Sequence, residues 1–462
     1  MLLKTFKGGV HPYEGKELSK DRPIEVYMPK GELVFPMAQH IGAPAKPLVK
    51  VGDEVLVGQK IGEAVGFISA NVICSVSGKV KKIEPRKNNK GAMVESVIVE
   101  NDGNYSTIEG FGQDRDASKL SKEEIRSIDE VSATDIIDAI KEAGIVGLGG
   151  AGFPTHVKLT PKDDEKIEYI LVNAAECEPY LTSDYRLMLE EPEKIIGGLK
   201  IILSLFPNAK GIIGVEDNKP DAIKILSELA QKEEKISVQS LISKYPQGGE
   251  RSLIKVLTDR EVNSSMLPAD AGCVVDNVDT VISIYMAVAK STPLIRKIIT
   301  VTGDAVAKPQ NYNVRLGTMY SELLEASGGL SVEAQKIVCG GPMMGDALAD
   351  VNIPVAKNSS ALTAFKVDAV SSNPETPCIK CSRCVGVCPS ILVPQLMMEA
   401  VKTNNKERFV QLNGMECIEC GACAFVCPAK IPLTQGFKFL KQAVMADRRK
   451  KAAEQQAKGG AK

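Results

Sequence analysis

The sequence predicts a multidomain α/β chain that ends in a cysteine-rich module, and three observations support this fold class. Residues 1–110 contain short apolar runs between glycines and prolines, which is typical of a small β domain. Strand-like and helix-like segments then alternate up to about residue 295, as they do around a parallel sheet. Eight of the 12 cysteines lie between residues 378 and 427.

Length and composition limit the possible functions. The 462 residues suggest roughly two to four domains, and the net charge of −1 gives no basic excess that would favour nucleic acid as the partner. No apolar segment reaches the roughly 18 residues that a transmembrane helix needs, and the N-terminus lacks a signal peptide's apolar region. We therefore expect a chain that neither spans a membrane nor is exported, and that would act at a membrane only by docking on integral partners.

Periodicity places the elements of the α/β region and of a smaller module behind it. In the α/β region it predicts helices at 132–143, 192–205 and 220–233, and strands at 167–172 and 211–215. The smaller module has strand-like segments at 298–303 and 311–315 and a helix at 319–326. A charged linker, 113–130, precedes the α/β region. The Ala-, Gln- and Lys-rich end, 446–462, predicts a solvated, frayed tail, with a weak basic contact to a membrane or partner as the alternative.

The cysteine motif C-x2-C-x2-C-x3-C-P occurs twice. Its members are Cys378, Cys381, Cys384 and Cys388, and then Cys417, Cys420, Cys423 and Cys427. This is the spacing of bacterial two-cluster ferredoxins, in which the fourth cysteine binds the other cluster. One predicted [4Fe–4S] cluster therefore takes Cys378, Cys381, Cys384 and Cys427, and the other takes Cys417, Cys420, Cys423 and Cys388. Zinc is the alternative, but it prefers pairs of C-x2-C.

A glycine-rich loop, Gly147 to Thr155, contains G-x-G-x-x-G. Such a loop lets backbone N–H groups approach a phosphate or a planar ring. By itself it is equally compatible with a structural turn, and only Ile145 and Val146 precede it, so a standard Rossmann motif is not indicated. The strand at 167–172 ends in a polar run from Asn173 to Tyr180. Ligands of α/β proteins bind at the carboxyl ends of parallel strands.

Residues 130–345 resemble the flavin-binding subunit of respiratory complex I. The resemblance is carried by Gly147-Leu-Gly-Gly-Ala-Gly-Phe-Pro-Thr155, by the strand end at Asn173, by Gly249-Glu250 and by Val275-Asp-Asn-Val-Asp-Thr280. It implies a Rossmann-like domain with FMN on Gly147, Gly149, Gly150, Lys158, Asn173 and Asn277. It also implies that nicotinamide stacks near Phe153, in a pocket lined by Glu176, Glu178 and Glu250. Hydride transfer would be mediated by FMN, with no catalytic side chain.

The sequence departs from that family at three positions. Ala175 replaces an Asp, Asp276 replaces the first Asn of a pair, and Arg251 replaces the second Glu of a pair. Lys158 has an alternative interpretation as a solvated surface lysine. Cys177 beside the polar run is interpreted as a small buried hydrophobe, as are Cys74, Cys273 and Cys339.

Two flanking modules also resemble known domains. Residues 298–330 resemble the soluble-ligand-binding β-grasp (SLBB) module, and residues 35–86 resemble a lipoyl-like barrel-sandwich. No lysine stands at the expected hairpin tip, 66–70, so this domain is predicted to be a scaffold or docking unit. The predicted domains are 1–112 (barrel-sandwich), 130–295 (flavin and NAD(H)), 296–345 (β-grasp), 365–445 (two-[4Fe–4S] ferredoxin) and 446–462 (flexible tail).

The order of these modules resembles the C subunit of the Rnf complex, an ion-translocating ferredoxin:NAD+ oxidoreductase. Further matches are 5–12, 39–47 and 340–345. The resemblance implies a peripheral subunit on the cytoplasmic face of the cell membrane. It would pass electrons between partner subunits, including a ferredoxin-like B subunit, and NAD+, while integral partners move the ion. The alternatives are an NADH-dependent reductase such as a cobalamin reductase, and a non-enzymatic electron wire, which the departures at Ala175 and Asp276 would allow.

Overall fold

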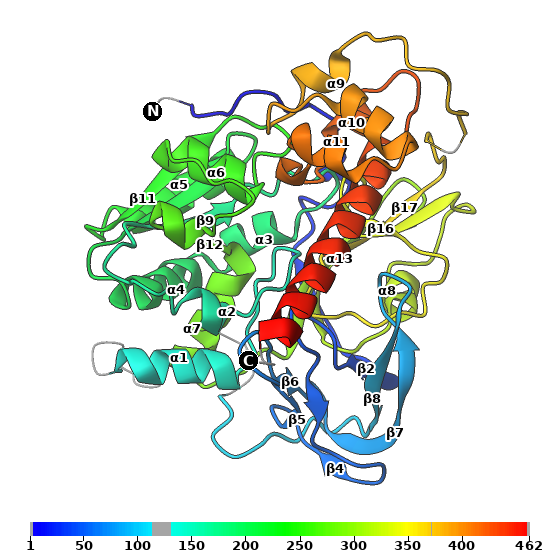
Figure 1. Cartoon of the computed structure of the whole chain (residues 1–462). Helices are drawn as coiled ribbons and strands as arrows, with labels where there is room; N and C mark the ends of the chain where they lie inside the picture. The colour runs from blue at the N-terminus through cyan, green and yellow to red at the C-terminus, as the bar shows by residue number, and fades with distance from the viewer. Residues whose placement is uncertain (1–2, 113–130, 371, 460–462) are drawn as a thin grey trace.

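The computed structural model describes residues 3–112, 131–370 and 372–459; the predicted linker lies outside them. In Figure 1 the α/β layer lies on the left, the β domain at the bottom, strands β16 and β17 of a six-stranded sheet on the right, and the cysteine-rich module at the top. The C-terminal helix, α13 (Leu433–Gly459), runs from this module down towards the β domain (Figure 1).

The β domain consists of two small antiparallel sheets. One has the order β2-β8-β7-β4 and the other β3-β5-β6. Their strands are β2 (Glu32–Pro36), β3 (Lys46–Pro47), β4 (Glu54–Val55), β5 (Lys60–Glu63), β6 (Val72–Ile73), β7 (Gly78–Lys87) and β8 (Met93–Asn101). Leu33, Phe35, Ile61 and Val97 are fully buried between the sheets. The connection from β5 to β6 contains the predicted hairpin tip, where Phe67 is 71% exposed.

The α/β layer is built on a fully parallel sheet with the order β11-β10-β9-β12. The strands are β9 (Tyr169–Ala174), β10 (Lys210–Glu216), β11 (Ile236–Leu241) and β12 (Cys273–Asn277). The helices are α1 (Ala133–Glu142), α2 (Thr155–Lys158), α3 (Ser183–Glu190), α4 (Pro192–Ser204), α5 (Pro220–Ala230), α6 (Glu250–Thr258) and α7 (Val278–Lys290). The predicted elements are confirmed to within a few residues, because local signals fix them: Ser132 caps α1, and α4 and α5 begin with proline.

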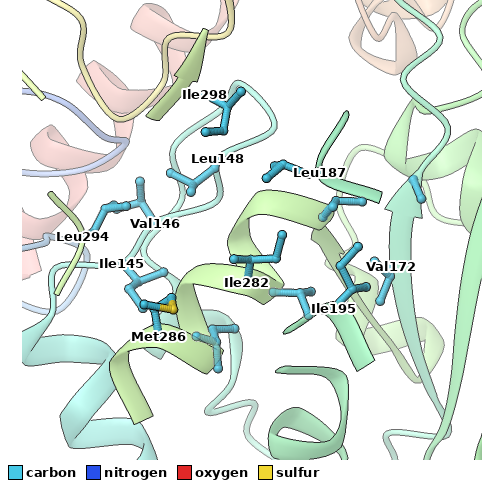
Figure 2. Packing of buried hydrophobic residues seen from close by; sticks show 14 of the residues in the cluster. Ile145, Val146, Leu148, Val172, Leu187, Ile195, Ile282, Met286, Leu294 and Ile298 are labelled. Carbon is cyan, nitrogen blue, oxygen red and sulfur yellow. The ribbon is translucent and has the colours of Figure 1, made fainter. Parts of the chain in front are cut away.

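The main hydrophobic core anchors the start of the glycine-rich loop. Ile145, Val146 and Leu148 are buried in the same cluster as Ile282 and Met286 of α7, as Figure 2 shows. Burying each such side chain contributes about 1.5–3 kcal/mol. The apolar residues before and within the loop therefore fix where it leaves the core.

The six-stranded sheet is wider than the predicted β-grasp module. Its order is β1-β14-β13-β17-β15-β16. The predicted β-grasp elements are confirmed as β13 (Arg296–Thr302), β14 (Gln310–Arg315) and α8 (Tyr320–Ala326). The sheet also contains β1 (Ile24–Tyr27), β15 (Lys336–Cys339), β16 (Asp346–Ala347) and β17 (Ala361–Phe365). All seven residues of β13 are buried, so its backbone needs hydrogen-bonding neighbours on both edges. The next strand in sequence, β14, pairs with one edge, and the more distant β17 pairs with the other.

The cysteine-rich module has two short helices, α9 (Arg383–Gly386) and α12 (Ala422–Phe425), and the longer α10 (Pro394–Lys402), α11 (Lys406–Gln411) and α13. The predicted tail is not frayed as far as Gly459, because α13 continues to that residue, whereas its solvated character agrees with the exposed side chains of residues 446–455. Ala, Lys, Arg and Gln are strong helix formers, and Lys406 pairs with Asp447 at 2.8 Å. Short 3-10 turns lie at Lys16–Leu18, Pro268–Ala271 and Gly414–Glu416. Among the described residues, no helix is both long and apolar enough to span a membrane.

Candidate functional site

The predicted polar residues meet at the carboxyl edge of the parallel sheet. Asn173 at the end of β9 and Asn277 at the end of β12 are neighbours in register. A Cβ atom on Gly149 would lie 3.1 Å from the Cβ atom of Asn277. Gly149, Asn173 and Asn277, which are far apart in sequence, therefore share one edge, which we call the sheet edge.

The glycine-rich loop is held at its ends and open at its tip. The Gly147 N–H donates to Phe153 O at 2.8 Å, and the Leu148 N–H donates to the Thr280 hydroxyl at 2.9 Å. The tip is exposed, and a Cβ atom on Gly150 would meet nothing within 4 Å. Within the described part of the chain, the N–H groups of Gly149 and Gly150 donate no hydrogen bond. These two groups are free to bind an anionic or planar ligand.

Lys158 is engaged by the protein rather than solvated. Its Nζ lies 2.8 Å from Asp276 Oδ1 and donates to Val275 O at 2.7 Å. The Lys158 side chain is 21% exposed and that of Asp276 is 0% exposed. The surface-lysine alternative is therefore wrong. Lys158 also explains how an aspartate is tolerated at position 276, since it compensates the buried charge.

Two of the three predicted pocket glutamates already serve the fold. The Glu176 carboxylate accepts from Asp184 N at 2.7 Å and from Tyr185 N at 3.2 Å, at the start of α3. Glu178 Oε1 accepts from Met343 N at 2.6 Å and from Met344 N at 3.2 Å. Glu250 is different, because it is exposed at the start of α6 and its side chain has no hydrogen-bond partner within the described ranges. Of the three carboxylates, that of Glu250 is the one available to a ligand.

Four of the motif cysteines surround one void in the cysteine-rich module: Cys388, Cys417, Cys420 and Cys423. This is the predicted mixed set, with one cysteine from the first motif and three from the second. Cys384 and Cys427 lie close enough that the charge of Cys427 raises the pKa of Cys384, after burial as the larger cause. Cys378 and Cys381 are exposed. Thiols around a void fit a cubane cluster, whereas a zinc ion needs ligands that converge on one point, and none of the described residues do so.

One short segment, residues 245–251, touches both the sheet edge and the second cysteine loop. Asn173 Nδ2 donates to Gly248 O at 2.8 Å, on the side of the sheet edge. The Tyr245 hydroxyl donates to Cys420 O at 2.6 Å, on the side of the cysteines. Arg251 Nη1 lies 3.0 Å from Glu416 Oε2, just before Cys417. The two predicted redox sites are therefore adjacent.

The comparisons with known families match all four modules. Residues 4–104 match the RnfC barrel sandwich hybrid domain and 140–286 the Nuo51 FMN-binding domain. Residues 298–347 match the SLBB domain and 377–431 the 4Fe-4S dicluster domain. The predicted fold class is confirmed.

Curated relatives match this chain over most of its length. The chain is 42% identical over 396 residues to the C subunit of the proton-translocating ferredoxin:NAD(+) oxidoreductase complex of Clostridium ljungdahlii, and the match covers 86% of this chain and 84% of that protein. It is also 42% identical to the C subunit of the Na(+)-translocating ferredoxin:NAD(+) oxidoreductase complex of Acetobacterium woodii, over 96% and 98% of the two chains. The chain belongs to the RnfC family. A further member of this family, from Pseudomonas aeruginosa, is 37% identical over 97% of this chain and 57% of its own length.

The FMN-binding domain of this RnfC chain has several buried side-chain atoms without a hydrogen-bond partner among the described residues, and Gln247 contributes two of them. Gln247 is fully buried in segment 245–251, and neither its amide oxygen nor its amide nitrogen has a partner among the described residues. Buried polar groups are normally hydrogen-bonded. A bound ligand or an ordered water would supply the hydrogen-bond partners that Gln247 lacks. Together with the free N–H groups of Gly149 and Gly150 beside Asn277, this arrangement is compatible with FMN at the sheet edge.

Sequence reasoning missed two residues at this edge. It predicts no role for Gln247, because a single glutamine belongs to no motif. Asp184, in the first turn of α3, accepts from Asn277 Nδ2 at 2.6 Å. Burial and then the charge of Glu176 raise the pKa of Asp184 to about 7. No motif marks Asp184 in the sequence, because its partner Asn277 lies on a distant helix cap.

Glu178 predicts a pH dependence of stability. Burial raises its pKa to about 7, while the N–H groups of Met343 and Met344 act in the opposite direction. The folded chain therefore binds a proton that the unfolded chain, with a glutamate pKa of about 4.3, has released. The stabilising contribution is complete below about pH 4.3 and is lost as the pH rises through about 7.

We expect Glu178→Gln to remove this pH dependence. The amide oxygen still accepts from Met343 and Met344, but it does not titrate. As the pH rises from about 5 to about 8, the free energy of unfolding of the unsubstituted chain should fall by more than that of the variant, and the difference should be up to about 3 kcal/mol. Denaturant titrations at both pH values measure this, with Glu228→Gln on α5 as an exposed control. Parallel pH profiles of the two chains would contradict the prediction.

Proposed function

We propose that this chain is the electron-transfer subunit of an ion-translocating ferredoxin:NAD+ oxidoreductase complex. It carries electrons between ferredoxin-reduced partner subunits and NAD+. Bound FMN supplies the chemistry that links two-electron hydride exchange to one-electron carriers. The observation that carries the proposal is segment 245–251, which contacts Asn173 at the sheet edge and Cys420 in the cysteine loop. A flavin and a cluster held at these two places would be neighbours.

The residues of the sheet edge have distinct proposed roles. The free N–H groups of Gly149 and Gly150 bind the FMN phosphate or ring, and Gly147 shapes the loop. Asn173 and Asn277 orient the flavin, and Lys158 acts by neutralising Asp276. The remaining members of the proposed pocket contact or border nicotinamide: Phe153, which is half-buried beside the loop, Glu250 with its free carboxylate, and Glu176 and Glu178 as supports of the pocket wall.

The proposed cluster ligands follow the mixed sets of cysteines. We call the cluster on Cys417, Cys420, Cys423 and Cys388 the inner cluster, because its loop lies against the flavin domain. We call the cluster on Cys378, Cys381, Cys384 and Cys427 the outer cluster, because its first two ligands are exposed. The proposed partners are a ferredoxin-like B subunit and integral subunits that move the ion, and the proposed location is the cytoplasmic face of the cell membrane.

An anaerobic preparation of the full chain tests this function. We expect bound FMN, about eight irons per chain as two four-iron cubes require, and bleaching of the flavin absorbance when NADH is added. NADH oxidation with menadione, a small neutral acceptor, should accompany it. Eight irons without FMN and without bleaching would instead identify an electron wire. A preparation that holds FMN but whose flavin absorbance does not change when NADH is added would exclude NAD(H) as the substrate.

A further inference from the structure

The two cysteine loops are equivalent in conformation. Lys380 and Glu419, each two residues after the first cysteine of its motif, have φ angles of 55° and 59°. Their N–H groups each donate to that cysteine's sulfur, at 3.4 Å in both loops. Two residues later, Ser382 and Gly421 are both left-handed and precede α9 and α12. The surface formed by residues 378–383 of the first loop can therefore be compared, residue by residue, with the surface formed by residues 417–422 of the second loop.

In the second loop this face is covered by the rest of the chain. Ile418 packs in a cluster with Val10 and Tyr245, and Cys420 is only 8% exposed. Ala422 is fully buried, and a Cβ atom on Gly421 would lie 2.8 Å from Met343 O. The face is thus an interface between the second cysteine loop and the rest of the chain, to which the flavin domain contributes Tyr245.

In the first loop the equivalent face is uncovered. Ile379, which corresponds to Ile418, is 69% exposed, and Cys381, which corresponds to Cys420, is exposed. We call the surface made by Cys378, Ile379, Lys380, Cys381 and Arg383 the first-loop face. It presents an apolar side chain and two of the predicted cluster thiols to solvent, in the arrangement that the second loop uses to pack against the rest of the chain.

The charges of the two loops are opposite. In the second loop, Glu416 pairs with Arg251 at 3.0 Å and Glu419 pairs with Lys441 at 3.1 Å. The first loop has Lys380 where the second has Glu419, and Arg383 where the second has Ala422. Both basic side chains are exposed, and neither has an acidic partner in the described part of the chain. The first-loop face therefore carries uncompensated positive charge around an exposed apolar side chain.

We propose that the first-loop face is the docking surface for an acidic, iron–sulfur-carrying redox protein. The proposal rests on the proposed function and names the class of partner that meets the outer cluster. Opposite charges accelerate association of such partners and fix their orientation. Two electrons delivered one at a time at this face, with one proton, would reduce one NAD+ to NADH at the sheet edge.

A loop-exchange variant tests the surface without disturbing the cluster ligands. Lys380→Glu with Arg383→Ala gives the first loop the residues that the second loop already has at these positions, so the backbone can accommodate them. The control is Arg448→Glu with Arg449→Ala on the exposed end of α13, which changes the net charge equally. Each full chain, loaded anaerobically with FMN and iron, is assayed with a reduced acidic two-[4Fe–4S] ferredoxin as the electron donor to NAD+.

The expected result is a loss of about tenfold or more in the ferredoxin-dependent rate constant at low ionic strength for the loop-exchange variant. Its rate should also lose the decline with added salt that the unsubstituted chain shows. The control should keep both the rate constant and the decline with added salt. Ile379→Ser should lower the ferredoxin-dependent rate constant without changing its response to salt. NADH oxidation with menadione should remain unchanged throughout. Equal ferredoxin-dependent rate constants in all chains would overturn the docking proposal, and so would the absence of electron transfer from ferredoxin to the unsubstituted chain. Absence of the menadione reaction in the unsubstituted chain would overturn the proposed function itself.

Discussion

Cys388→Ser is expected to remove the inner cluster, although Cys388 belongs to the first cysteine motif. The reason is geometric, since Cys388 lines the same void as Cys417, Cys420 and Cys423. Cys427→Ser should remove the outer cluster instead. Each variant should retain about four of the eight irons, and electron transfer from ferredoxin to NAD+ should fall to background in both, because either loss interrupts the path.

NADH distinguishes the two variants. In Cys427→Ser, the remaining inner cluster is next to the flavin domain, so its paramagnetic resonance signal should develop with NADH. In Cys388→Ser, the remaining outer cluster should be reduced by dithionite but only slowly by NADH. Cys273→Ala, a buried cysteine outside both motifs, is the matched control and should keep about eight irons. Identical NADH responses of the two variants would contradict the mixed ligand sets.

Much of this site was predictable because its signals are local. The cysteine spacing alone predicts the mixed sets, and in the structure Cys388 lines the same void as three cysteines of the second motif. The polar run after a buried strand predicts that Asn173 lies at a ligand-binding edge. Strand β9 does end there, beside the end of β12. In both cases a short local pattern, the cysteine spacing or the polar run after a strand, indicates the site, although the residues that meet there are far apart in the sequence.

The remainder depends on contacts between distant residues, which one sequence does not reveal. The carboxylate of Glu178 is engaged by Met343 and Met344, far along the chain. The sequence likewise predicts no contact between the N-terminal residues and the cysteine-rich module. In the structure, the Gly9 N–H donates to Val387 O at 2.8 Å. Gly8 approaches Cys388 so closely that a Cβ atom would lie 2.8 Å from Cys388 O. The N-terminus thus helps to hold Cys388, the first-motif ligand of the proposed inner cluster, near Tyr245 of the flavin domain, whose carbonyl accepts from Val10 N–H at 2.8 Å. The composition of the N-terminus does not indicate this role.

Lys158→Met is expected to lower the free energy of unfolding by about 3 kcal/mol. Removing one partner of a buried ion pair costs about 3–5 kcal/mol, because the other charge is left without compensation. The lower figure applies because the Lys158 side chain is 21% exposed, while Asp276 is fully buried. Denaturant unfolding of the FMN-free chain measures this, and Lys162→Met, an exposed lysine on the same segment, should change the free energy by less than about 0.5 kcal/mol.

A double variant separates the structural role of Lys158 from direct contact with FMN. Lys158→Met combined with Asp276→Asn removes both charges, so most of the lost stability should return. If Lys158 acts through Asp276, the double variant should also regain FMN affinity, because no uncompensated charge then remains next to Asn277. If Lys158 bound the FMN phosphate itself, affinity would stay low in the double variant while stability recovered. FMN dissociation constants and unfolding free energies are measured on the unsubstituted chain, the Lys158→Met and Lys162→Met variants and the double variant. Together they decide which negative charge Lys158 neutralises, that of the protein or that of the cofactor.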